Sequence, residues 1–60
     1  MGELYERLNN EQKAIIMEVC EELRIDTINC EIVVSEVFDC LAIKYDLGYY
    51  ILDISVEEVR

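Results

Sequence analysis

Three cysteines, Cys20, Cys30 and Cys40, are the residues of this chain whose type is best suited to chemistry. A thiol can bind zinc, form a disulfide or act as a nucleophile. Their spacing of ten turns a helix through about 1,000°, so they do not share one helix face. The sequence has no CxxC pair and no histidine, which is atypical of a zinc site. An odd number of thiols behind an acidic N-terminus indicates a reducing compartment. We predict structural core thiols and no metal; one reactive or inter-chain cysteine is the alternative.

Acid–base and nucleophilic catalysis have little support in the sequence. The lack of histidine removes the commonest general acid–base and any Ser-His or Cys-His pair. With only Gly2 and Gly48, no glycine-rich phosphate loop is possible. Carboxylates are plentiful, but 60 residues leave little room for a water-excluding pocket around two of them. We predict no enzyme activity and no cofactor.

Charge is the strongest compositional signal. Fourteen acidic residues oppose five basic ones, giving a formal net charge of −9, although 53% of the residues are hydrophobic. A folded core under an acidic surface is therefore expected, not a disordered acidic tail. Such a surface disfavours direct binding to nucleic acid and favours a basic protein partner, or serves solubility alone. Regular carboxylates on one helix edge can imitate nucleic-acid phosphates, and the residues predicted to do so are Glu11, Glu18, Glu21 and Glu22.

The first regular element is a helix over about residues 10–24. Asn9 is a good N-cap and Gln12 completes a capping-box pattern. One apolar face is predicted to reach the core, made by Ile15, Ile16, Val19, Cys20 and Leu23. The whole chain, residues 1–60, is expected to be a single domain.

A second helix is predicted over about residues 27–45, with Asp26 as its cap and Gly48 beyond its end. Its main apolar arc would hold Cys30, Val34, Val37, Phe38, Leu41 and Tyr45. Ile32 and Ile43 would form a second apolar face, which another copy of the chain is expected to cover; the alternative is that the C-terminal strand covers it. The alternative is a strand over residues 28–34, rich in β-branched residues, followed by a shorter helix capped by Ser35.

A C-terminal strand is predicted over about residues 49–54, with Tyr50, Leu52 and Ile54 on one side. A last helical turn is predicted to begin at Ser55, since Ser55 and Glu58 make a second capping box. The fold class is thus a small mostly-α or α+β domain. A domain of this size is marginal alone, and the strand needs a ladder partner, so we expect homodimerisation to complete it. The predicted interface comprises Ile32, Cys40, Ile43, Tyr50, Leu52 and Ile54.

Four tyrosines suggest a further contact surface, because tyrosine combines rigid apolar area with a polar tip. They are Tyr5, Tyr45, Tyr49 and Tyr50. No apolar run approaches the ~18 residues of a membrane span, and Glu6 stands where myristoylation prefers Ser or Thr. A cytoplasmic location without membrane contact is expected.

Together these features favour a non-enzymatic, acidic protein-binding module that inhibits or regulates a larger intracellular protein. Its size and acidity are typical of small phage-encoded regulators, an analogy of type that assigns no residue a role. The alternative is a structural subunit of a larger assembly. A small-molecule binder or enzyme built at a dimer interface is a third hypothesis.

Overall fold

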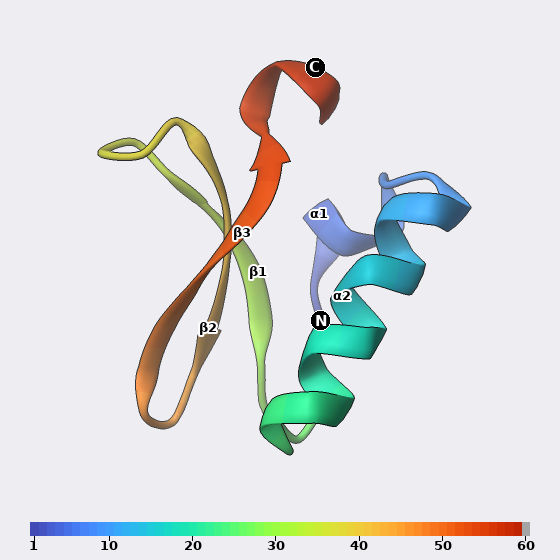
Figure 1. Cartoon of the computed structure of the whole chain (residues 1–60), viewed down its shortest axis with the longest axis vertical. Helices are drawn as coiled ribbons and strands as arrows, with labels where there is room; N and C mark the ends of the chain where they lie inside the picture. Colours follow the sequence, from blue (N-terminus) through green and yellow to red (C-terminus); the bar gives the residue numbers. More distant parts are fainter. Residues whose placement is uncertain (60) are drawn as a thin grey trace.

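The computed structural model describes residues 1–59, which form a small α+β domain with one long helix and a three-stranded antiparallel sheet. A short helix, α1 (Glu3–Glu6), precedes α2 (Asn10–Leu23). The strands are β1 (Glu31–Ser35), β2 (Cys40–Tyr45) and β3 (Gly48–Ser55), in the order β1-β2-β3. A 3₁₀ helix, η1 (Val56–Val59), follows β3. Figure 1 shows the chain along this course.

The predicted first helix is confirmed to within one residue. The Asn9 side chain accepts a hydrogen bond from the Gln12 N–H at 2.8 Å, and the Gln12 side chain accepts one from the Asn9 N–H at 3.0 Å. This capping box satisfies two donors that the first helical turn leaves free. Arg24 ends the helix in a left-handed conformation, and the Ile25 N–H donates to the Cys20 carbonyl at 2.8 Å.

The predicted helix over residues 27–45 is wrong. That segment forms β1, a turn and β2, so the alternative strand prediction is confirmed for its first part and wrong for the helix after Ser35. Ser35 does accept a hydrogen bond from the Phe38 N–H, at 3.3 Å, but it stabilises a four-residue hairpin turn. Asp39 closes the turn with a φ of 52°, a left-handed conformation that Asp tolerates better than most residues. The fold is therefore α+β and not mostly α.

A second hairpin, between β2 and β3, forms where the sequence predicts the end of a helix. Tyr45 pairs with Gly48, which leaves Asp46 and Leu47 as a two-residue loop. Gly48 has a φ of 129°, so it supports the tight turn and not a helix C-terminus. The predicted strand over residues 49–54 is confirmed as β3, and its partner β2 belongs to the same chain.

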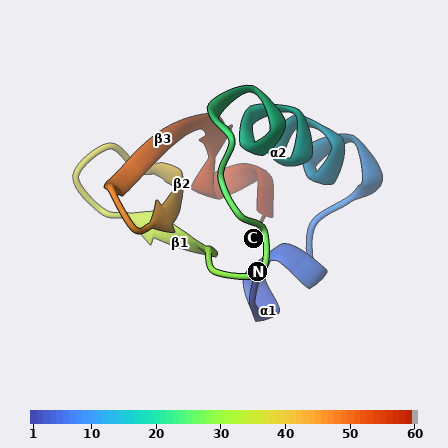
Figure 2. The same ribbon diagram turned by 90° about the horizontal axis from the view of Figure 1, so that it is seen from below.

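The core lies between α2 and one face of the sheet, here called the inner face and made by Ile32, Leu41, Ile43, Leu52 and Ile54. Ile32 lies opposite Ile43 across the β1–β2 ladder. Cross-strand partners share a face, so this pair meets the buried Ile16 and Cys20 of α2 in one cluster. Figure 2 shows α2 on one side of the sheet and the N-terminal segment beside β1. A backbone hydrogen bond of 3.1 Å from the Ile32 N–H to the Met1 carbonyl ties that segment to the free edge of β1.

Ser55 and Glu58 form the second predicted capping interaction near the end of the chain. The Ser55 N–H donates to the Glu58 carboxylate at 2.9 Å, and the Glu57 N–H donates to the Ser55 hydroxyl at 3.2 Å. These bonds start η1 directly after β3. The Val56 N–H also donates to the Asp39 carbonyl at 3.2 Å, which joins this end of the sheet to the β1–β2 turn.

A candidate binding groove on the outer face of the sheet

The other side of the sheet, here called the outer face, carries a row of three apolar residues. Val33 of β1 pairs with Ala42 of β2, and Ala42 pairs with Ile51 of β3. The pairing places all three on one face, with the smallest side chain between two larger ones. A hollow therefore runs over Ala42, with Val33 and Ile51 on either side of it.

The β1–β2 turn adds a wall at one end of this hollow. Val37 and Phe38 extend from the turn with exposed fractions of 87% and 65%. The turn is held by the Ser35–Phe38 hydrogen bond and by the bond from Val56 to the Asp39 carbonyl. Large apolar side chains are thus kept at the surface by a hydrogen-bonded turn, where they remain free to contact another molecule.

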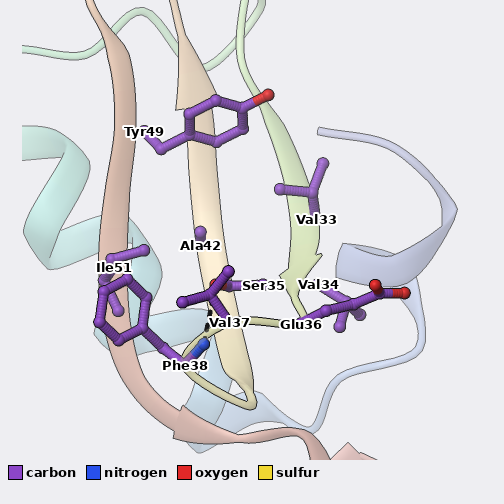
Figure 3. A pocket seen from close by; sticks show the side chains of 9 residues that line it. All are labelled: Val33, Val34, Ser35, Glu36, Val37, Phe38, Ala42, Tyr49 and Ile51. Atoms are coloured by element: carbon purple, nitrogen blue, oxygen red, sulfur yellow. Dashed lines mark hydrogen bonds between the residues drawn. The ribbon is translucent and has the colours of Figure 1, made fainter.

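The resulting groove has a volume of about 400 Å³. Its lining residues are Val33, Val34, Ser35, Glu36, Val37, Phe38, Ala42, Tyr49 and Ile51. In Figure 3, Tyr49 lies on one side of the Val33–Ala42–Ile51 row and the Val37–Phe38 turn lies on the other. The groove offers apolar contact area with a few polar groups at its rim, namely the Tyr49 hydroxyl, the Ser35 hydroxyl and the Glu36 carboxylate. This arrangement suits an apolar side chain of a binding partner.

The predicted acidic stripe lies elsewhere. Glu11, Glu18, Glu21 and Glu22 are all exposed on α2. Ile16 and Cys20 face the sheet from the same helix, so the stripe points away from the core. The groove lies beyond the sheet, on the opposite side of the domain from this stripe. The two candidate surfaces are therefore separate, and the binding role of the stripe stays a prediction.

The fold buries four of the six residues of the predicted dimer interface in the core and leaves the other two more exposed. Ile32, Ile43, Leu52 and Ile54 are buried in the core of the single chain, at no more than 3% exposure. Their burial is explained by α2, without a second copy, and the two-faced helix that suggested the interface does not form. Cys40 is half-buried and Tyr50 remains 39% exposed. Homodimerisation itself stays a prediction.

The three cysteines are free thiols, and Cys20 and Cys30 are buried. Burial raises the pKa of the Cys20 thiol above its ordinary value, and its contact with Cys30 raises that pKa further. The Cys30 thiol donates to the Thr27 carbonyl at 3.7 Å. The Cys20 thiol thus stays protonated at neutral pH. Cys20 and Cys30 are both buried, as the small core residues that the sequence predicted.

The four tyrosines do not form one surface. Tyr49 lines the groove, whereas Tyr45 and Tyr5 pack half-buried against the core. The Lys13 ammonium lies 5.4 Å from the centre of the Tyr5 ring, within cation–π distance. Only Tyr49 therefore belongs to the candidate site.

Sequence reasoning did not identify the groove as a site. The predicted helix over residues 27–45 puts Val37 and Phe38 in its core arc, but this helix does not form, and no role is predicted for Ala42. The available signal was the alternation of Leu41, Ala42 and Ile43 within β2. It puts the small Ala42 on one face of the sheet and the two large residues on the other. That signal gains meaning only once β1 and β3 are known to flank β2.

Across residues 1–59, no cluster of three or more His, Cys, Asp or Glu side chains is placed to hold a metal ion. None of the helices in this described part combines the length and apolar character needed to cross a membrane. A scan against protein-family models found no match to this chain, and searches of curated proteins and of solved structures found none either.

Proposed function

We propose that this chain is a non-enzymatic, acidic protein-binding module that regulates a larger protein through the groove on its outer face. The observation that carries the proposal is the exposed pair Val37 and Phe38, fixed by a hydrogen-bonded turn beside the Val33–Ala42–Ile51 row. Apolar side chains of this size are costly to leave in water, and a contiguous group of them is typical of an interaction site. The net charge of −9 and the lack of histidine support binding in preference to catalysis.

The test compares two double variants that remove the same kind of exposed apolar surface from different places. Val37→Ser with Phe38→Ser removes the groove wall. Ile28→Ser with Leu47→Ser removes two side chains that are 87% and 85% exposed and do not line the groove. Each protein is immobilised and exposed to a lysate of the source cell or its host. We expect one stoichiometric partner to bind the wild type and the Ile28/Leu47 variant, and to be lost with the Val37/Phe38 variant. Equal capture by all three proteins would contradict the proposal.

The second candidate function is an assembly subunit, and the free edge of β3 favours it. β3 is eight residues long and pairs only with β2 among the described residues. A long edge strand with exposed Tyr49 and Ile51 can pair with an edge of another copy. Sedimentation over the micromolar range separates the cases: a constant mass near 7.0 kDa contradicts self-assembly, a closed dimer supports the predicted homodimer, and growth with concentration supports an assembly subunit.

A further inference from the structure

The outer face has the dimensions of a single helix. Three strands about 4.8 Å apart make a surface roughly 14 Å wide, and the six residues of β2 extend it over about 20 Å. A helix with its side chains is about 10–12 Å across, so one helix of roughly four turns fits along this face. The inner face is already covered by α2 in this way. A helix on the outer face would give the sheet a second covering layer, the usual arrangement when both faces of a sheet are apolar.

A second copy of the chain suits this face less well. The outer face presents only about 300 Å² in projection by the same dimensions. A stable symmetric interface buries roughly 800 Å² on each partner. Each copy also carries a net charge of −9, so two outer faces would meet against mutual repulsion. Limited area and like charge therefore both favour a different partner.

The charges around the groove indicate the sign of the charge that the partner carries. The segment that forms the sheet contains one base, Lys44, and five acids, which are Glu31, Glu36, Asp39, Asp46 and Asp53. Glu36 lines the groove. The strand alternation places Asp53 on the face of Ile51, and it places Glu31 on the face of Val33, where Glu31 lies opposite Lys44. Among the described residues, Glu36 and Asp53 are therefore the acids on this side of the sheet without a base as their cross-strand neighbour. An apolar groove between carboxylates favours an apolar stripe flanked by Lys or Arg.

Resting on the function proposed above, we infer that the groove receives a basic amphipathic helix of the partner protein. The apolar stripe of this helix lies above the small, buried Ala42 and contacts the exposed Val37, Phe38 and Ile51. Its flanking bases face Glu36 and Asp53. This is recognition of a helix in a groove, in which apolar side chains spaced i, i+3, i+4 and i+7 supply the contacts.

The probes are three synthetic 18-residue peptides with the same leucine stripe. The first carries Lys and Arg on its flanks, the second carries Glu there, and the third repeats the basic sequence with two central prolines that prevent a helix. Binding is measured by calorimetry, and the site is located from amide chemical shifts of the labelled protein. We expect the basic peptide to bind and to shift the amides of Val33, Phe38, Ala42 and Ile51. We expect at least about tenfold weaker binding of the other two peptides.

Variants of the protein distinguish binding in the groove from general electrostatic attraction of a basic peptide to an acidic chain. Val37→Ser with Phe38→Ser should weaken the basic peptide at least about tenfold, as expected for central apolar contacts. Ile28→Ser with Leu47→Ser is the control and should leave its affinity unchanged. Unchanged melting temperatures and amide spectra outside the turn establish that each variant is folded.

A second set of variants tests the charges. Glu36→Gln with Asp53→Asn should weaken the basic peptide several-fold and reduce the salt dependence of binding. The matched control neutralises the acidic stripe on α2 by Glu11→Gln, Glu18→Gln and Glu22→Gln and should change affinity by less than twofold. Loss of binding with the α2 variant, or peptide-induced shifts confined to α2, would overturn the inference.

Other occupants give other results, and each of them overturns the inference. Stronger binding of the proline peptide, with shifts along β3, would identify an extended strand as the ligand. A wild-type dimer that the Val37/Phe38 substitutions convert to a monomer would identify a second copy. Failure of all three peptides, together with groove-dependent capture of a partner from lysate, would reject the helix and leave the proposed binding function intact.

Discussion

The two faces of the sheet are built from the same three strands, yet they differ in how their apolar residues are covered. On the inner face, Leu41, Ile43 and Ile54 are no more than 2% exposed beneath α2. On the outer face, Ile51 is 40% exposed and Val33 is half-buried, and both line the groove together with the small, buried Ala42 between them. Both faces are apolar at their centre, but residues 1–59 contain a single long helix, and it covers the inner face.

The comparison shows that apolar character alone does not distinguish a core from a binding surface. A small domain buries one face to fold, and the burial of Ile16, Cys20 and the inner face provides most of its apolar stabilisation. The outer face keeps Val37, Phe38 and Ile51 exposed, and it is the surface through which we propose that a partner binds. The two faces should therefore respond differently to mutation: the inner one through stability, and the outer one through binding.

The largest difference is expected when a charge is placed on each face. Ile43→Glu puts a carboxylate at the centre of the inner face, where the side chain is fully buried. The desolvation cost of several kcal/mol exceeds the stability typical of so small a domain, so the variant should be unfolded. Far-UV circular dichroism and the dispersion of amide resonances measure the outcome.

The control for this experiment is Val37→Glu in the exposed turn of the outer face. It should change the free energy of unfolding by no more than about 0.5 kcal/mol, since the side chain is almost fully in water. A folded Ile43→Glu protein of wild-type stability would show that the inner face is not the core. It would also reopen the prediction that Ile43 lies in an interface.

A smaller effect is expected from two adjacent isoleucines of α2, because only one of them covers the inner face. Ile16 is fully buried, whereas Ile15 is 41% exposed. Ile16→Ala should lower the free energy of unfolding by about 2–5 kcal/mol through lost burial and a residual cavity. Ile15→Ala should lower it by less than about 1.5 kcal/mol. Urea unfolding of both variants measures the difference, and equal losses would contradict the placement of α2.

The smallest expected effect is a pH dependence that comes from the buried side of the domain. The pKa of Cys20 is raised in the folded chain by burial and by Cys30, so the unfolded thiol loses its proton at a lower pH. The stability that this difference contributes is fully present at neutral pH, and it is lost as the pH rises above about 9. Urea unfolding between pH 7 and pH 10 should show a steeper loss for the wild type than for Cys20→Ala. Cys40→Ala, which retains Cys20, serves as the control and should follow the wild type; identical pH profiles for all three proteins would exclude the effect.

Local sequence signals determined the parts of the fold in which neighbouring residues decide the outcome. Asn9 and Gln12 fixed the start of α2, and its boundaries were predicted to within one residue. The alternation of Leu52 and Ile54 with exposed neighbours identified β3, and Ser55 with Glu58 identified the last turn. Capping bonds span three residues and the side-chain alternation of a strand spans two, so the sequence alone contains the necessary information.

Pairing between strands decided the secondary structure of residues 27–45 and, with it, the candidate site. The spacing of Ile32 and Ile43 fits three turns along one line of a helix, and it fits the two strands of a hairpin equally well. In the structure they lie opposite each other in a hairpin. The strand prediction for β3 required a ladder partner, and the choice between a partner in this chain and one in a second copy rested on contacts remote in sequence. The groove depends on the same choice, since Val33, Ala42 and Ile51 meet only when three strands pair in this register. Such pairings gain their free energy from packing between distant segments, which the local pattern of apolar residues does not specify.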